Sequence, residues 1–261
     1  MKPGVNGFTV LSYNIFGARG LKNEDDYDKL TRVIRDINPD FLLLQEVDSC
    51  TMRQASLKCN SAIKLRDLLN ATTTYRWEYN YSPAEYNPYN LGGAYGDAVL
   101  SRHKILWEKD YHLDYAPEHS NEAECEKRSV AVIKAKVYNR DIYIASTHFD
   151  HLKTEYSRIS QAKQLKDIVN EYKGKTLVLG GDFNSVPSSE TMKIVFDYMT
   201  PSYTDLTQYT FPSQMSGTPT RMIDYVMSAK FSTEIRCMSS HVLNNEASDH
   251  CAVYATYMFT D

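Results

Sequence analysis

Short apolar runs alternate with segments of helical periodicity along the whole chain. Between residues 26 and 37 apolar side chains recur on one helical face, and Asn38-Pro39 follows, which predicts an amphipathic helix that ends before the proline. The same periodicity predicts helices over 61–69 and 156–172, and a serine cap signal favours another over 188–198. About four helices are therefore expected.

The apolar runs between these helices have the length of buried strands. They cover residues 8–14, 41–45, 75–81, 98–101, 105–112, 130–137, 142–148, 176–179, 222–227, 235–242 and 252–259. Many strands interleaved with a few helices predict a layered α/β architecture, in which two sheets are covered by helices. No repeat or linker divides the chain, so a single domain over residues 1–261 is expected.

Two stretches stand outside this pattern. Residues 82–95 are rich in Tyr, Pro and Gly and include Tyr86, Tyr89 and Tyr95, and residues 116–127 are polar. Both are too long for plain turns, and loops of this length usually carry function or move. Tyrosines in the first stretch suit a membrane surface, a base or a sugar, or simply pack a surface loop.

Composition and charge narrow the class of protein. Hydrophobic residues make up 42% and charged residues 24%, the balance of a soluble globular protein. No apolar run approaches the ~20 residues that span a bilayer. The N-terminus lacks a signal-peptide pattern, which fits a cytoplasmic protein or a secreted one after loss of its leader. A net charge of −4 gives no general attraction to nucleic acid, although a local basic patch would still permit it.

Five cysteines are an odd number, and their spacing does not match a metal finger. Cys50 and Cys59 are close enough in sequence to close a loop. Mostly free thiols are nevertheless expected.

Polar side chains suited to a metal or a phosphate follow several predicted strands. They are Asn14, Glu46, His148, Asp182 and Asn184, with Asp249-His250 in the last turn and Asp224 inside an apolar run. A carboxylate at the end of an apolar run is costly to bury unless a cation or hydrogen bonds compensate it. Several that converge from strand ends predict a hard-cation site, because Mg²⁺ prefers oxygen ligands.

Seven motifs, in order along nearly the whole chain, resemble the endonuclease/exonuclease/phosphatase superfamily, which includes deoxyribonuclease-like enzymes. They are LSYNI (11–15), LLLQEV (42–47), GDAVLSR (96–102), STHFDH (146–151), GGDFNS (180–185), MIDYVM (222–227) and ASDHCAV (247–253). The resemblance implies a four-layer α/β/β/α sandwich of two mainly antiparallel sheets. It also implies a catalytic domain that uses Mg²⁺, with Mn²⁺ as a substitute.

The resemblance also implies roles for single residues. Glu46 would be the principal metal ligand, with Asn14 beside it and Asp249 holding the ion or its waters. Asp182 would orient and help deprotonate the attacking water, while Asn184 would donate to a phosphate oxygen.

Two histidines complete the implied site. His250, oriented by Asp224, would act as general base or as a donor to the transition state. His148 would contact the phosphoryl group, either by stabilising its charge or by protonating the leaving oxygen.

Other substrate contacts are more open. Arg128 matches an arginine of many relatives and would hold a phosphate bidentately, or else form an ion pair with Glu124 or Glu126. Asp97 stands where relatives often carry asparagine or a small residue, and would steady His148 or accept backbone hydrogen bonds. Tyr95 belongs to the tyrosine-rich stretch and is a candidate substrate contact.

Structural roles are the alternative for each residue taken alone. Asn14 could end a strand, Asp182 and Asn184 could form a turn, and Asp224 could pair with Arg221. All of these would have to hold together, which favours a hydrolase that cleaves a phosphodiester or phosphomonoester bond. Nucleic acid, a phospholipid headgroup and a small phosphorylated metabolite all stay open as substrates. The alternative is a catalytically silent relative that binds partners.

Overall fold

The computed structural model describes residues 6–20, 22, 24–54, 58–88, 91–122, 125–203, 205 and 208–260, and these contain twelve strands and four α-helices. The first sheet is built from β1 Gly7–Asn14, β2 Phe41–Ser49, β3 Glu78–Tyr86, β4 Ala94–Ser101, β11 Ile235–Leu243 and β12 Ala252–Phe259. The second is built from β5 Ile105–Leu113, β6 Arg128–Val137, β7 Arg140–His148, β8 Thr176–Asp182, β9 Met199–Pro201 and β10 Asp224–Ala229. The helices are α1 Tyr27–Ile37, α2 Ser61–Thr72, α3 Tyr156–Asn170 and α4 Glu190–Tyr198.

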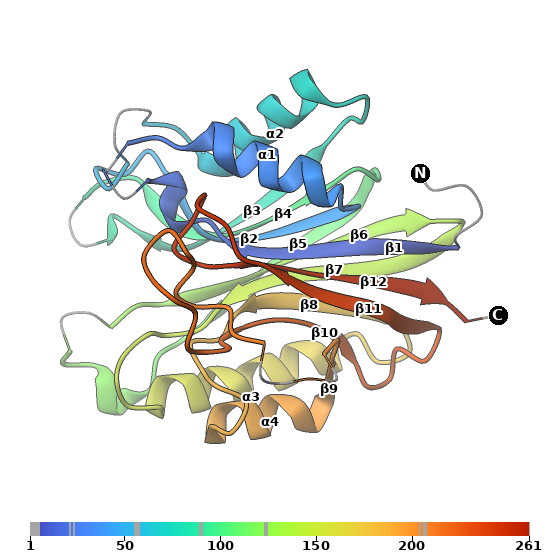
Figure 1. Ribbon diagram of the computed structural model, residues 1–261. Helices are drawn as coiled ribbons and strands as arrows, with labels where there is room; N and C mark the ends of the chain where they lie inside the picture. Colours follow the sequence, from blue (N-terminus) through green and yellow to red (C-terminus); the bar gives the residue numbers. More distant parts are fainter. Residues whose placement is uncertain are drawn as a thin grey trace.

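The two sheets pack face to face (Figure 1). Their strand orders are β11-β12-β1-β2-β4-β3 and β5-β6-β7-β8-β10-β9. Of the ten pairings between described strands, β1–β2 and β7–β8 are parallel and the others are antiparallel. The predicted sandwich of mainly antiparallel sheets is therefore confirmed.

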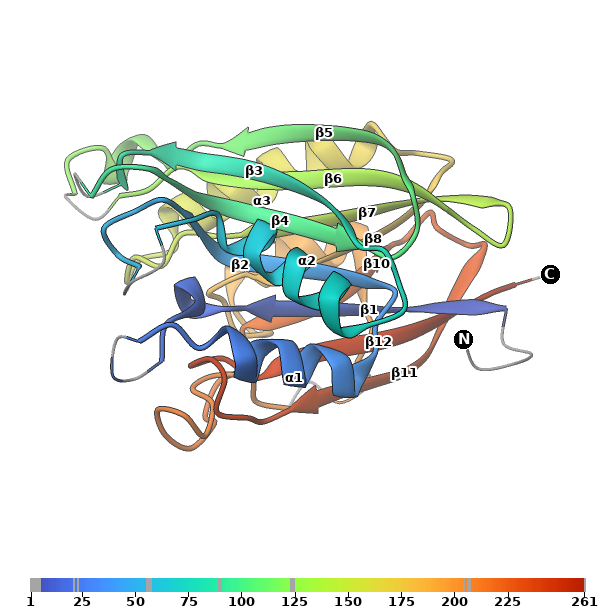
Figure 2. The same ribbon diagram turned by 90° about the horizontal axis from the view of Figure 1, so that it is seen from above.

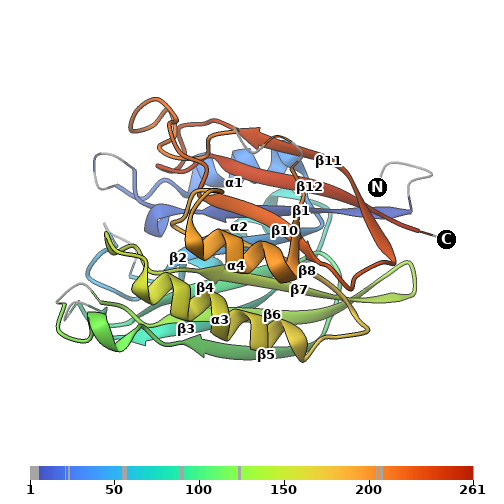
Figure 3. The ribbon, with the colours of Figure 1, turned by 90° about the horizontal axis from the view of Figure 1, so that it is seen from below.

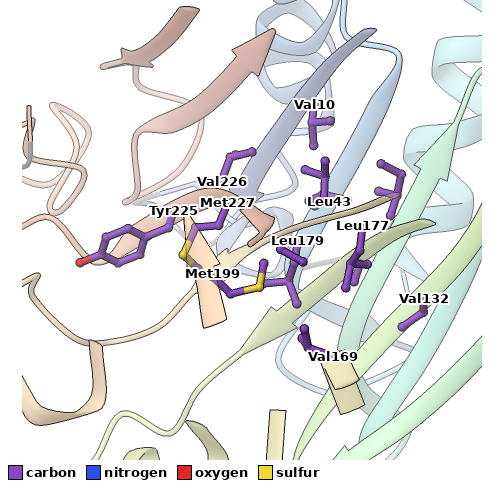
Figure 4. Close-up of a cluster of buried hydrophobic side chains, with 14 of the residues drawn as sticks. Val10, Leu43, Val132, Val169, Leu177, Leu179, Met199, Tyr225, Val226 and Met227 are labelled. Carbon is purple, nitrogen blue, oxygen red and sulfur yellow. The ribbon is translucent and has the colours of Figure 1, made fainter. Parts of the chain in front are cut away.

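Helices cover the outer face of each sheet. Helices α1 and α2 lie over the first sheet, as the view from above shows (Figure 2), and α3 and α4 lie side by side under the second (Figure 3). Alternation along β1 explains this arrangement. Leu11 belongs to the cluster that packs against α1, whereas Val10 belongs to the core between the sheets, where it lies near Leu43 (Figure 4).

The tyrosine-rich stretch was predicted to be a loop, and the structure corrects this in part. β3 continues through Ser82 to Tyr86, and β4 already begins at Ala94. β3 is an edge strand, where a proline can be tolerated, and the register shifts between Pro83 and Glu85. Tyr89 lies outside the described residues.

The described residues of the second long segment, 116–122 and 125–127, lie outside the sheets, as predicted, and a buried histidine anchors them. The 3-10 helix η3, Pro117–His119, ends in this residue. His119 is within 2.6 Å of Ser157 Oγ and 2.5 Å of Thr154 Oγ1, so the segment is fixed to the start of α3.

Two further expectations can be compared with the structure. The five cysteines are free, as expected, although the Cys50 amide donates to the Cys59 carbonyl at 3.2 Å. Among the described residues, none of the helices has the length and apolarity to cross a bilayer.

Candidate active site

Strand ends bring most of the predicted polar residues to one edge of the sandwich. His148, Asp182 and Asp224 are register partners on the neighbouring strands β7, β8 and β10. Asn14 ends β1 in the other sheet, and its Nδ2 donates to Asp182 Oδ2 at 3.1 Å. This bond joins the two sheets, so residues far apart in sequence meet at one place.

Two of the predicted residues have left-handed backbone conformations. Glu46 has a φ of 54° and Asn184 a φ of 47°. Glu46 lies where the register between β2 and β4 shifts, a bulge that redirects a side chain at the end of a strand. Such conformations are costly for residues with a Cβ and cluster at functional sites.

Asp224 and His250 form a tightly bonded pair. His250 Nδ1 lies 3.0 Å from both carboxylate oxygens of Asp224, and Thr210 Oγ1 donates to Asp224 Oδ2 at 2.6 Å. His250 Nε2 then faces Asp182 Oδ2 at 3.6 Å. Burial would lower the pKa of His250, but Asp224 and Asp182 outweigh it and raise this pKa to about 10.

Asn14 connects the predicted metal ligand to the rest of the site. Besides Asp182, its Nδ2 faces Glu46 Oε1 at 3.3 Å, while its Oδ1 accepts from the Phe16 amide at 3.0 Å. Ser248 Oγ donates to the Asn14 carbonyl at 2.6 Å, which holds the 248–250 turn against β1. The turn carries Asp249 and His250 to this edge.

The surroundings disfavour the charged form of two of these carboxylates and favour the charged form of the third. Burial, reinforced by Asp224, raises the pKa of Asp182 to about 7. Burial also raises the pKa of Asp249 to about 6, and Glu46 adds to this effect. At Glu46 burial acts in the same direction, but Arg53 and His250 outweigh it and lower the pKa.

These donors suit a hard dication. Mg²⁺ and Mn²⁺ prefer oxygen ligands, and such an ion would also relieve the repulsion between neighbouring carboxylates. Ligand atoms of Asp182, Asp224 and His250 also lie within 4.8 Å of one another. Asp224 is already bonded to His250 and Thr210, and Asn14 Oδ1 already accepts from the Phe16 amide. Glu46 and Asp249 are therefore the carboxylates best suited to bind such an ion.

Arg53 is part of this site and was missed by the sequence analysis. Its Nη2 donates to Glu46 Oε2 and its Nε to Asp48 Oδ2, both at 3.0 Å, and its guanidinium lies 4.8 Å from the Tyr95 ring centroid. The residue lies in a connection after β2, where no periodicity indicates its direction. Only the structure reveals it.

The surroundings of His148 fix its protonation state. Its Nδ1 lies 3.0 Å from Arg128 Nη1 and 3.1 Å from the Tyr95 hydroxyl. Because arginine can only donate, Nδ1 accepts and the proton resides on Nε2. Burial, with Arg128 next, lowers the pKa of His148 well below its usual value, so this histidine is neutral.

The proton on Nε2 of His148 points toward a second donor. Asn184 Nδ2 lies 3.1 Å from His148 Nε2 and donates to the Phe149 carbonyl at 3.0 Å. Two N–H groups thus converge at one point, with Asp182 Oδ2 3.5 Å from His148 Nε2. An anionic oxygen at this point would accept from both.

Arg128 is buried and bonded on several sides. Its Nη2 forms an ion pair with Glu126 at 2.6 Å and approaches His151 Nδ1 at 3.1 Å, while its Nη1 also donates to Tyr95. The alternative partner, Glu124, lies outside the described residues. A direct phosphate contact by Arg128 or Tyr95 stays a prediction.

Asp97 and Asp224 are held by hydroxyl groups as well. Asp97 Oδ2 accepts from Ser129 Oγ at 2.6 Å, and burial raises the pKa of Asp97 to about 7.

Arg221 stacks on Phe211, with 4.8 Å from its guanidinium carbon to the ring centroid. In the described part of the chain, Asp224 pairs with His250 rather than with Arg221.

A groove of about 670 Å³ lies elsewhere, near the opposite ends of the strands. Its walls include Phe8, Asp40, Arg102 and Tyr254. None of the predicted site residues lines it. Hollow space therefore does not locate the site, whereas the converging polar groups do.

The two-sheet fold and its edge of carboxylate, amide and imidazole groups define a protein suited to phosphorylated substrates. Residues 11–250 match the Endonuclease/Exonuclease/phosphatase family. The chain belongs to this family. No curated protein sequence matches it significantly.

Solved structures show the same fold at low sequence identity. An endonuclease/exonuclease/phosphatase from Beutenbergia cavernae has a TM-score of 0.77 and 20% identity, over 97% of this chain and 72% of that one. A mannosyl-6-phosphatase from Bacteroides thetaiotaomicron has a TM-score of 0.74 and 16% identity, over 97% and 100%. The catalytic domain of human Nocturnin, with bound sulfate, has a TM-score of 0.68 and 18% identity, over 98% and 94%.

Proposed function

We propose that this protein is a metal-dependent phosphoesterase that hydrolyses a phosphodiester or phosphomonoester P–O bond by attack of water. The observation that carries the proposal is the convergence of acceptors and donors on one edge. Asp182 Oδ2 lies 3.5 Å from His148 Nε2 and 3.6 Å from His250 Nε2, so a carboxylate stands between two imidazoles. This arrangement suits a phosphoryl group and a water molecule together.

Asp182 is the group that activates water in this proposal. Its raised pKa, about 7, makes it a stronger base than an exposed aspartate. Asn14 holds its Oδ2 and the Asn184 amide donates to its Oδ1 at 2.8 Å, so the carboxylate is fixed in orientation. A water beside it would be held for attack on phosphorus.

Three donors would stabilise the charge that develops on the phosphoryl oxygens. His148 and Asn184 present N–H groups, and His250, charged through its contact with Asp224, presents a third. Since His148 is neutral and carries a single proton on Nε2, stabilising charge fits it better than protonating the leaving oxygen. For His250, the donor role fits better than the role of general base.

Glu46 and Asp249 would hold Mg²⁺ or Mn²⁺, and Asn14 beside them would orient Glu46 and Asp182 through its amide nitrogen. When bound, the ion would offset the repulsion between the carboxylates and an anionic substrate and would polarise the P–O bond. Arg53 and Asp48 would keep Glu46 in place.

A substrate panel with and without chelator tests the proposal. It contains a bis-aryl phosphate, plasmid, DNA with an abasic site, sphingomyelin and a sugar phosphate, each with excess Mg²⁺ or Mn²⁺. At least one should be hydrolysed, and chelator should abolish the reaction. Hydrolysis of none would reject the enzyme and favour a catalytically silent relative that binds partners.

A further inference from the structure

Two arginines, Arg19 and Arg53, lie beside the edge that carries the carboxylates. The proposed mechanism gives no role to Arg19. Arg19 follows the 3-10 helix η1, Phe16–Ala18, and Arg53 follows β2. A Cβ placed on Gly17 would lie 3.4 Å from Arg19 Nε and 3.4 Å from Arg53 Nη2. The two guanidinium groups are therefore neighbours that both lie next to Gly17, on the side where a Cβ would point.

Gly17 makes this close approach possible. Its φ is 63°, and a Cβ there would lie 2.5 Å from Asp48 Oδ2, so only glycine fits without displacing that carboxylate. The loop after β1 consequently lies directly on the Asp48–Arg53 pair. The close approach brings Arg19 to the site.

The two arginines differ in how their charge is balanced. Arg53 forms ion pairs with Glu46 and Asp48 at 3.0 Å. Arg19 donates its Nε to the Phe16 carbonyl at 3.3 Å and lies 4.4 Å from the Phe16 ring centroid. Within the described part of the chain, no carboxylate lies within ion-pair distance of Arg19.

A half-buried cation next to a second cation is unfavourable. Burial, with the charge of Arg53 next, lowers the pKa of Arg19, and the nearby carboxylates of Glu46, Asp48 and Asp249 oppose this shift without cancelling it. An anion held between the two guanidinium groups would remove this cost, and their planar forks match phosphate oxygens. Because Arg53 Nη2 contacts Glu46 Oε2, such an anion would lie one side chain away from the proposed metal ligand.

We propose that Arg19 and Arg53 form a subsite for a second phosphate group of the substrate, carried a few bonds away from the phosphoester that is cleaved. This inference rests on the proposed function and makes it more specific. The preferred substrate is then a small molecule or nucleotide end with two phosphates, rather than one with a single charged group.

Two esters that share one scissile bond test the subsite. The first is the 5′-(p-nitrophenyl phosphate) of thymidine, and the second is the same ester with a 3′-phosphate. Charge-assisted hydrogen bonds to the added phosphate should raise kcat/KM about 10- to 100-fold for the second ester, with Mg²⁺ or Mn²⁺ present. Equal values for the two esters in the unaltered protein would overturn the subsite.

Variants of Arg19 sharpen the result, because changing Arg53 would also disturb Glu46. Arg19→Ala should remove the preference for the second ester and change kcat/KM for the first by less than about 3-fold. Arg19→Lys keeps the charge without the fork and should retain part of the preference. Arg35→Ala, an exposed arginine on α1, is the matched control and should change neither value. An equal loss on both esters in Arg19→Ala would contradict a subsite.

Binding without metal separates this inference from the proposed function. Calorimetry in the presence of chelator compares thymidine 3′,5′-bisphosphate with thymidine 5′-phosphate. The unaltered protein should bind the bisphosphate about 10-fold more tightly, and Arg19→Ala should abolish the difference. If the esters are not cleaved but this difference is found, the subsite stands, and the substrate panel alone decides whether the protein is a hydrolase. If the difference is absent, the subsite fails whatever the activity.

Discussion

The two histidines of the candidate site are the same side chain in opposite surroundings. His250 lies next to two carboxylates, Asp224 and Asp182, and its pKa is raised to about 10. His148 lies next to Arg128 and Tyr95, and its pKa is lowered well below the usual value. A charged and a neutral imidazole thus face one carboxylate, Asp182. Their neighbours, rather than the residue type, assign each its chemistry.

The largest expected effect comes from removing a carboxylate of the site. Glu46→Ala removes the proposed principal metal ligand and should lower activity at least ~10³-fold, since the ion supplies several kcal/mol of transition-state stabilisation. The thermal midpoint should stay near that of the unaltered protein, because little packing is lost. Glu118→Ala, an exposed acid on η3, is the control. Unchanged metal dependence in Glu46→Ala would show that another residue holds the ion.

Replacing each histidine in turn compares their contributions to catalysis directly. At saturating metal, His250→Ala should lower kcat by ~10³-fold, because a charged donor to the phosphoryl oxygens is lost. His148→Ala should cost less, about 10²-fold, since it removes one neutral donor while Asn184 remains. Single-turnover rates on the best substrate measure both. A His250→Ala variant that keeps more than a tenth of the activity is incompatible with the role given to it.

Exchanging the neighbours should move the two pKa values toward each other. Asp224→Asn should lower the pKa of His250, because the carboxylate that favours the charged ring is gone. Arg128→Gln combined with Glu126→Gln removes a buried ion pair as a whole and should raise the pKa of His148 partly, since burial remains. Nitrogen NMR of the two imidazoles in metal-free protein follows both the tautomer and the titration. If His148 does not respond, burial alone holds it neutral.

The smallest expected effect is on stability. The folded-state pKa of His250 lies above its unfolded value of about 6.5. Its contribution to the free energy of unfolding is therefore fully present below pH 6.5 and is lost as the pH rises through about 10. Urea unfolding of metal-free protein at pH 7.5 and pH 10 should show this decline, and Asp224→Asn should reduce it. An identical decline in both proteins would assign it to other groups.

Much of the fold follows from patterns that the sequence displays. Apolar runs of strand length and the helical period between 26 and 37 predict the elements, because a buried face needs regular spacing. β3 beyond Tyr81 was missed, since Pro83 and the tyrosines are typical of loops and only an edge position tolerates them. The three-residue strand β9 is too short to give any period.

The candidate site, too, could be predicted from the sequence only in part. Strand ends indicate Asn14, Glu46, His148 and Asp182, because a polar residue after a buried strand must face something that compensates it. Arg53 and Arg19 lie in connections, where direction depends on loop conformation and on Gly17. The tautomer of His148 could not be predicted either, since it depends on Arg128, twenty residues earlier in sequence.

The pairing of β1 with β12 also has a consequence during synthesis on the ribosome. Ser248 reaches back across 234 residues to bond Asn14, and β12 completes the sheet beside β1. A nascent chain that has emerged only as far as β10 holds Glu46 and Asp182 but not His250. If His250 has the proposed role, neither such a nascent chain nor a fragment from interrupted translation would hydrolyse phosphoesters.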